Sequence, residues 1–182
     1  MSRVPLLDTT TAPADSRSLL GQIHQAFGAT PNMFRAVAHS PAALRSMWGS
    51  FGALAQGALD ARLGEQIAVA VAERNGCEYC LAAHTALGRK AGATAGEMAA
   101  AQAGEASDPQ ASAALRFALK LVNERGHVGA QDLQAMRAAG FNDAQIVEVV
   151  AHVALNLFTN YVNVAFAVPL DFPAVPLRSR AA

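Results

Sequence analysis

The sequence has few cysteines, few charged residues and no excess of either charge. Only 2 of its 182 residues are cysteine, and charged residues make up 15% of the chain, below the roughly one quarter that is typical of soluble domains. Lysine and arginine together number 14, as do aspartate and glutamate, so the formal net charge is zero. This balance argues against a nucleic-acid partner, because contact with phosphates needs a basic surface.

Other familiar signals are missing as well. The N-terminal segment has no basic stretch followed by an apolar run, so we find no signal peptide and expect a cytoplasmic protein. There is no glycine-rich phosphate loop, and nothing indicates haem, flavin or nicotinamide, so we expect no cofactor. The low content of charged residues and the zero net charge leave little electrostatic repulsion between monomers, so we expect a homo-oligomer.

Alternating runs of β-branched residues are scarce, whereas alanine and leucine are abundant, and this predicts an all-α fold in a single domain. We expect a loose N-terminal arm over residues 1–20, a helical domain over residues 21–170, and a C-terminal tail over residues 171–182 that extends over a neighbouring subunit. Helix starts are predicted at the capping residues Ser40, Asp60, Thr94 with Glu97, Asp108, and Asn142 with Gln145.

The two cysteines lie together in the segment Cys77-Glu78-Tyr79-Cys80, and His84 follows one helical turn later. A helix that begins at about Cys77 places both sulfur atoms in its first turn and His84 on the same face. Unpaired amide groups and the positive end of the helix dipole favour a thiolate there. Structural disulfides are unusual in the cytoplasm, so this spacing indicates a redox-active dithiol.

Two carboxylates on the preceding predicted helix are candidates for orienting the His84 imidazole. Glu65 lies at the start of an apolar stretch, whereas Glu73 lies beside Arg74 at a helix end that is expected to be solvated. Ionisable groups in apolar surroundings are often functional, so we favour Glu65 over Glu73 as the partner of His84.

The last long predicted helix carries a polar row at helical spacing, opposite a wholly apolar face. The row consists of Glu148, His152, Asn156, Thr159, Asn160 and Asn163. Beyond Glu148 it contains no charged residue, which indicates a buried polar seam rather than a solvated surface. The seam lies either at a subunit contact or along the dithiol pocket. It also argues that residues 146–170 do not cross a membrane, so no membrane partner is expected.

The pattern formed by Glu65, Cys77, Cys80 and His84 resembles the alkylhydroperoxidase D-like family, within the carboxymuconolactone decarboxylase superfamily. The resemblance covers about residues 40–100, with a looser likeness to peroxidase-related members through residues 154–161 and 171–173. It implies an alkylhydroperoxidase D-like helical bundle, assembled as trimers or hexamers. It also implies reduction of a hydroperoxide substrate, with electrons from a dithiol protein or a small thiol.

The resemblance further implies a role for each residue of the motif. Cys80 would attack the peroxide, Cys77 would resolve the intermediate, and Glu65 and His84 would relay protons. Tyr79 is also a candidate for the site, because it stands where some members carry a histidine. A phenol with a pKa near 10 is a poor base at neutral pH, so the relay is shorter here or peroxide is not the best substrate.

Other interpretations remain open. The pair could exchange disulfides as a reductase, without peroxide. Glu65, Cys77, Cys80 and His84 could instead hold a metal ion, although structural zinc sites usually draw ligands from two separated pairs. Lactone decarboxylase chemistry would not need the cysteines. In a non-catalytic helical protein they would pack as small apolar residues.

Overall fold

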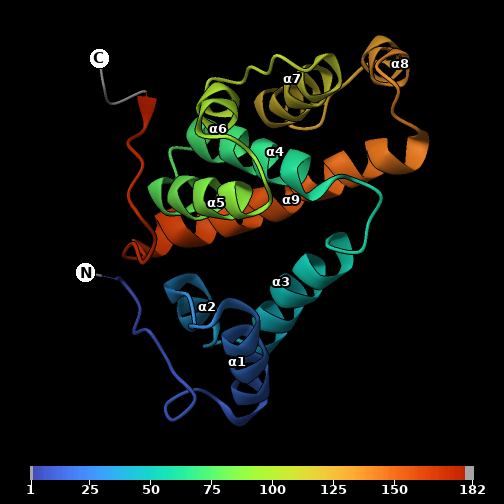
Figure 1. Ribbon diagram of the computed structural model, residues 1–182. Coiled ribbons are helices and arrows are strands. Elements are labelled where there is room, and N and C mark those ends of the chain that lie inside the picture. Colours follow the sequence, from blue (N-terminus) through green and yellow to red (C-terminus); the bar gives the residue numbers. More distant parts are fainter. Residues whose placement is uncertain (1, 179–182) are drawn as a thin grey trace.

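The computed structural model describes residues 2–178, and all regular elements within that range are helices (Figure 1). The layer drawn at the bottom of Figure 1 contains α1–α3, while α9 crosses the middle beside α4 and α5, and α6–α8 lie above. The all-α prediction is confirmed. The helices are α1 (Ala14–Phe27), α2 (Asn32–Val37), α3 (Pro41–Leu54), α4 (Ala61–Arg74), α5 (Glu78–Lys90), α6 (Ala95–Gln102), α7 (Pro109–Asn123), α8 (Ala130–Ala138) and α9 (Asp143–Phe166).

The predicted caps form the hydrogen bonds that define the helix starts. In each, a side-chain oxygen accepts a bond from a backbone N–H of the first turn that would otherwise lack a partner. The capping residues are Ser40, Asp60, Thr94, Asp108 and Asn142. Glu97 and Gln145 complete capping boxes by accepting from the backbone N–H of Thr94 and of Asn142.

The N-terminal arm is shorter than the sequence suggested, because α1 begins at Ala14 and not after residue 20. Ser16 is buried and donates a hydrogen bond to the carbonyl of Ala38. Leu20 and Ile23 are fully buried on the same helix. Packing against the α2–α3 region therefore stabilises a helix for which the local sequence gave only a weak start signal.

The described part of the C-terminal tail packs on its own chain, whereas we expected it to extend over a neighbour. The Asp171 carboxylate accepts a hydrogen bond from the backbone N–H of Asn32, and Phe172 packs edge-on against Tyr79. The carbonyl of Pro176 accepts a bond from Gln102. These contacts make the tail part of the wall around α5; residues 179–182 lie outside the described range.

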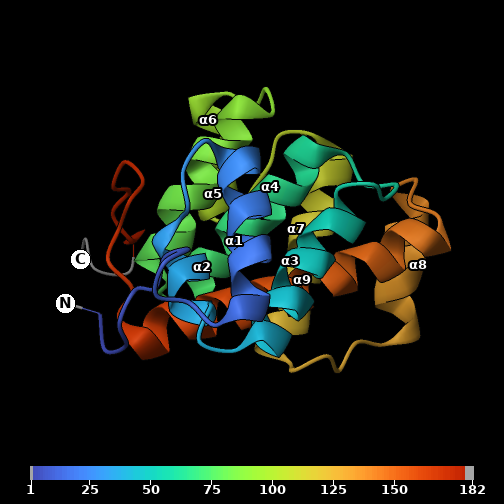
Figure 2. The ribbon, with the colours of Figure 1, turned by 90° about the horizontal axis from the view of Figure 1, so that it is seen from below.

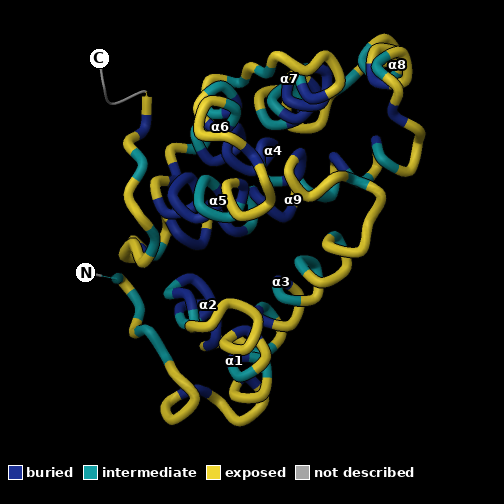
Figure 3. The backbone as a smooth tube through the Cα atoms, in the orientation of Figure 1, coloured by how far each residue is buried: buried dark blue, intermediate teal, exposed yellow. Residues whose placement is uncertain are grey.

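The core is centred on α4 and α5, where burial is greatest (Figure 3). Gly76 has φ +65°, a left-handed conformation that lets α5 turn back along α4. At Gly88 a Cβ atom would lie only 2.5 Å from the Met98 side chain and 3.3 Å from the Cβ of Glu65. The missing side chain therefore allows the close approach that brings Glu65 on α4 beside His84 on α5.

α9 turns its polar row toward the interior and much of its apolar face outward. Asn156, Asn160 and Asn163 are 4%, 0% and 3% exposed, whereas Val147 and Tyr161 are 67% and 62% exposed. Of the two places predicted for the polar row, the dithiol pocket is the one in which Asn163 and Thr159 lie, since both contact Cys80. By length and composition alone, α9 could span a membrane, with 24 residues and a mean hydropathy of 1.3. One such helix is weak evidence for a membrane, because core helices share these properties.

Candidate active site

The two cysteines lie at the start of α5, directly after the turn that connects it to α4. Cys77 is the N-cap residue, and its Sγ accepts a hydrogen bond from the backbone N–H of Cys80 at 3.3 Å. Both side chains are free thiols, and their residues are only 1% and 2% exposed. This geometry places Cys80 in the first helical turn, where the helix dipole favours a negative charge on sulfur.

Side chains from α9 complete the surroundings of Cys80. The Nδ2 of Asn163 donates to Cys80 Sγ at 3.1 Å, and the hydroxyl of Thr159 lies 4.0 Å from the same sulfur. Asn160 is held by Asn75, whose Nδ2 donates to its Oδ1 at 2.8 Å. The Nδ2 of Asn160 is buried and has no hydrogen-bond acceptor among residues 2–178. The polar row thus supplies fixed amide dipoles to the thiol.

These surroundings separate the pKa values of the two cysteines. Burial by itself raises the pKa of Cys80, but the hydrogen bond from Cys77, the charge on His84 and the amides of Asn163 and Asn160 lower it to about 6. The pKa of Cys77 is raised far above its ordinary value by its hydrogen bond to Cys80, by burial and by the charge on Cys80. At neutral pH, Cys80 is therefore the thiolate and Cys77 the neutral thiol that donates to it.

His84 and Glu65 form an ion pair on the next turn of the site. The Nδ1 of His84 lies 2.7 Å from the Oε2 of Glu65, and the His84 and Glu65 side chains are 10% and 23% exposed. Burial alone lowers the pKa of His84, but the charge of Glu65, its hydrogen bond and the Cys80 charge raise it above the ordinary value. A protonated imidazole is therefore available beside the thiolate.

Two cavities meet at His84. The thiol cavity, about 40 Å³, contacts Cys80 and is lined mainly by apolar side chains, among them Phe34, Phe51 and Phe172. The relay cavity, about 170 Å³, is also lined by His84, together with Glu65 and His152. The ion pair can therefore carry a proton between a small apolar chamber and a larger, more polar one.

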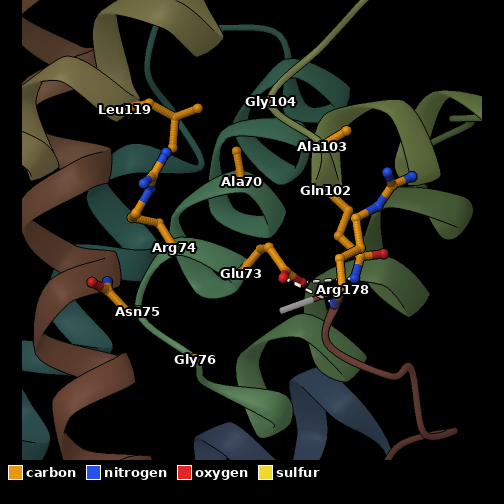
Figure 4. Close-up of a pocket in the computed structure, with 10 residues that line it drawn as sticks. All are labelled: Ala70, Glu73, Arg74, Asn75, Gly76, Gln102, Ala103, Gly104, Leu119 and Arg178. Carbon is orange, nitrogen blue, oxygen red and sulfur yellow. Dashed lines mark hydrogen bonds between the residues drawn. The ribbon is translucent and has the colours of Figure 1, made fainter. Parts of the chain in front are cut away.

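Glu73 does not line the thiol cavity. Its carboxylate accepts hydrogen bonds from the Gln102 amide at 2.7 Å and from the backbone N–H of Arg178 at 3.0 Å (Figure 4). The hollow beside it, about 630 Å³, is the largest of those that we describe, but neither cysteine lines it. The structure thus brings Glu65, and not Glu73, to the imidazole, and assigns Glu73 to the contact with the tail.

Tyr79 forms part of the wall of the thiol cavity. Its hydroxyl accepts a hydrogen bond from the backbone N–H of Met33 at 3.3 Å. Burial and the neighbouring Asp171 carboxylate raise its pKa well above the ordinary range. The phenol therefore stays protonated and holds α2 and the tail against α5, a positioning role rather than that of a base.

The sequence placed Asn163 in the polar row without identifying its partner, and the structure shows it as the direct donor to Cys80. Its position in the uncharged polar row was the available signal, but the spacing of the row alone does not give its partner. Within residues 2–178, no group of three His, Cys, Asp or Glu side chains is arranged to hold a metal ion.

Comparisons with known proteins agree with this fold. The Carboxymuconolactone decarboxylase family matches residues 41–124. A peroxidase-related protein from Ralstonia eutropha JMP134, described as an alkylhydroperoxidase AhpD core, has the same fold with a TM-score of 0.85 and 27% identity. The match covers 93% of this chain and 92% of that one. The chain is therefore similar to the carboxymuconolactone decarboxylase family over residues 41–124, and its fold is similar to that of an alkylhydroperoxidase AhpD core.

Other solved members of this fold differ in their chemistry. A peroxidase-related protein from Silicibacter sp. TM1040 has a TM-score of 0.80 and 24% identity, over 92% of this chain and 91% of that one. The debrominase Bmp8 has a TM-score of 0.72 and 20% identity, over 87% of each chain. No curated protein matches the sequence. These likenesses show the fold, and they name neither a reaction nor a substrate for this chain.

Proposed function

We propose that the protein is a thiol-dependent peroxidase that reduces hydroperoxides through a cycle of the Cys77–Cys80 pair. This proposal rests on the contacts that Cys80 makes with its neighbours. Asn163, Cys77 and His84 stabilise its thiolate at the wall of a small apolar cavity. A buried thiolate of this kind is a nucleophile for the O–O bond.

The first step oxidises Cys80. Its sulfur attacks the terminal oxygen of the hydroperoxide, the O–O bond breaks, and the alkoxide that leaves takes the proton of the His84 imidazolium. The products are a sulfenic acid and an alcohol. Glu65 stabilises the imidazolium before transfer and helps to return a proton to His84 from the relay cavity.

The second step uses Cys77, whose Sγ lies against the first turn of α5 and the backbone N–H of Cys80. Its sulfur attacks the sulfur of the sulfenic acid, and the hydroxyl group leaves as water with the Cys77 proton. An external dithiol then reduces the disulfide by thiol–disulfide exchange and is itself oxidised.

Consumption of an organic hydroperoxide, measured with dithiothreitol as electron donor, tests this function. The wild-type protein should turn over many equivalents, and Cys80→Ser should consume none. A disulfide reductase would reduce a model disulfide with dithiothreitol but would show no peroxide-dependent turnover. Equal peroxide consumption by the wild-type protein and Cys80→Ser would contradict the proposal.

A second candidate is reductive dehalogenation of an aromatic compound. The aromatic lining of the thiol cavity supports it, since a flat ring could stack there beside Cys80. In this reaction the dithiol supplies two electrons, the carbon–halogen bond is replaced by carbon–hydrogen, and halide and a proton are released as the disulfide forms. Measuring bromide released from a brominated pyrrole, in parallel with peroxide consumption, distinguishes the two activities.

A further inference from the structure

His152 belongs to the polar row of α9, and the proposed reaction steps do not use it. It lines the relay cavity together with Glu65 and His84, although the three residues come from three different helices. α9 packs against α3 and α4, and these helices lie together in both Figure 1 and Figure 2. The fold therefore places a second imidazole in the cavity that the ion pair borders.

The His152 ring packs against the backbone of α4 at Gly64, the residue directly before Glu65. A Cβ atom at Gly64 would lie 3.2 Å from Cε1 of the ring and 3.7 Å from Nδ1. A Cβ contact of 3.2 Å is tighter than real Cβ atoms normally make, so a side chain at this position would push the ring away. Glycine therefore lets the imidazole lie close to the turn of α4 that carries Glu65.

The ring nitrogens of His152 are available to water. Among residues 2–178, no hydrogen bond joins either nitrogen to another group, and the residue is only half-buried. The relay cavity of about 170 Å³ has room for several water molecules, since one needs about 15 Å³ of such volume. The exposed Asp60 also lines it, so water can enter from the surface. The Glu148 carboxylate, by contrast, accepts hydrogen bonds from two backbone N–H groups of the loop before α4.

The charges around His152 set the direction in which a proton moves. Burial lowers the pKa of His152, and the carboxylates of Glu148 and Glu65 raise it. The charge on His84 lowers it again, and the net shift is downward. At neutral pH the His152 imidazole is therefore neutral, with one nitrogen that accepts a proton and one that donates. Because the pKa of His84 is shifted upward, a proton taken up by His152 passes downhill to the Glu65–His84 pair.

We propose that His152 is the outer proton carrier of the site, which returns a proton from the solvent to the Glu65–His84 pair after each molecule of peroxide is reduced. This role rests on the proposed peroxidase function. In the oxidising half of the cycle, His84 gives its proton to the departing alkoxide. In the reducing half, the donor dithiol passes two electrons to the disulfide and releases two protons. Cys77 keeps one of these protons, and the other restores the imidazolium of His84.

The route of the second proton follows from the two cavities. The thiol cavity is small and lined mainly by apolar side chains, so it offers few partners for a proton on its way in. The relay cavity is larger and borders the surface at Asp60, and His152 stands in it beside the helix turn that carries Glu65. His152 touches no substrate in this scheme and acts only through the ion pair.

Pre-steady-state kinetics with an organic hydroperoxide and saturating dithiothreitol test this role. His152→Ala should leave the rate of the first turnover close to wild type, because His84 starts the reaction protonated. Later turnovers should slow by about tenfold, less than the 10²–10⁴ of a group that acts on the substrate directly, since water in the cavity also carries protons. His127→Ala removes an exposed histidine that lines neither cavity, and it should behave as wild type.

Two further measurements separate proton transfer from packing. His152→Gln fills the space beside Gly64 without a titratable group, so it should be as slow as His152→Ala. Added imidazole should restore the later turnovers of His152→Ala, because the space left by the ring opens into the relay cavity. It should not restore those of His152→Gln, in which that space is filled.

Exchange of the His84 ring N–H proton with water, followed by NMR in the resting protein, tests the same path without peroxide. This exchange should be severalfold slower in His152→Ala than in wild type. A wild-type protein that consumes no peroxide would refute the proposed function and leave the exchange rate to decide the role of His152. Unchanged exchange in His152→Ala would overturn the inference. Equal losses in the first and later turnovers would also overturn it, because they would make His152 a structural residue.

Discussion

The imidazole of His84 is held by Glu65 through a bond of 2.7 Å, and His84 lines the same cavity as Cys80, which lies one turn earlier on α5. One side chain thus links a nucleophile in an apolar chamber to a carboxylate at the edge of a second cavity. The arrangement depends on the close packing of α4 on α5, which Gly88 permits.

The relay predicts unequal effects for the two carboxylates of α4. His84→Ala should slow peroxide turnover by about a hundredfold, since a positioned acid–base group contributes about 10²–10⁴ in rate. Glu65→Gln should slow it less, because the imidazole remains but loses the charge that favours its protonation. Glu73→Gln is the matched control and should be close to wild type. Equal losses in both carboxylate variants would mean that the ion pair has no part in proton transfer.

The lowered pKa of Cys80 predicts the pH dependence of its reactivity. With a pKa of about 6, the thiolate is lost as the pH falls through 6 and is nearly complete above neutral pH. The rate of iodoacetamide alkylation at Cys80, followed by peptide mass spectrometry, should therefore rise through pH 6 and level off near pH 7. An ordinary thiol, with a pKa of about 8.5, would keep rising above pH 8. A midpoint above pH 8 would contradict the account of the site.

Asn163 predicts a shift of that midpoint. A hydrogen bond to a charged group is worth about 1.5–3 kcal/mol, so Asn163→Leu should raise the pKa of Cys80 by about one to two units. Asn156→Leu makes the same change on the same helix. The Asn156 amide donates to the His152 carbonyl at 2.9 Å, and no bond joins it to the sulfur. The Asn156 variant should therefore keep the midpoint near 6, and equal shifts in both variants would assign the effect to general disruption of α9.

Tyr79→Phe should separate positioning from proton transfer. The variant removes the acceptor for the Met33 N–H, so it should lower the free energy of unfolding by about 1–3 kcal/mol, measured by denaturant titration. The alkylation rate of Cys80 should stay within about twofold of wild type, because the phenol remains protonated throughout the working range. A tenfold loss of reactivity with normal stability would instead make Tyr79 a member of the relay.

Local signals in the sequence predicted much of the fold. Caps such as Asp60 and Asn142 involve residues three positions apart, and contacts of this range can be read without tertiary structure. The shared face of Cys80 and His84 follows from helical spacing for the same reason. The choice of Glu65 over Glu73 used the apolar character of the flanking residues and the family motif, and the structure brings Glu65 to the imidazole.

The features that were missed depend on long-range packing. Helical periodicity divides α9 into a polar and an apolar face, but it does not say which face meets the core. The buried amides of Asn160 and Asn163 have their partners, Asn75 and Cys80, far away in the sequence. The start of α1 was missed likewise, because the bond from Ser16 to Ala38 stabilises it from another element.

The state of the two cysteines after exposure to peroxide tests the central claim most directly. One equivalent of an organic hydroperoxide should lower the intact mass of the reduced protein by two hydrogen atoms and leave no free thiol. Cys77→Ser should gain one oxygen atom and stop at the sulfenic acid of Cys80, which dimedone would trap. Cys80→Ser should keep its mass and its single thiol. An unchanged mass in the wild-type protein, or peroxide consumption by Cys80→Ser at the wild-type rate, would contradict the account.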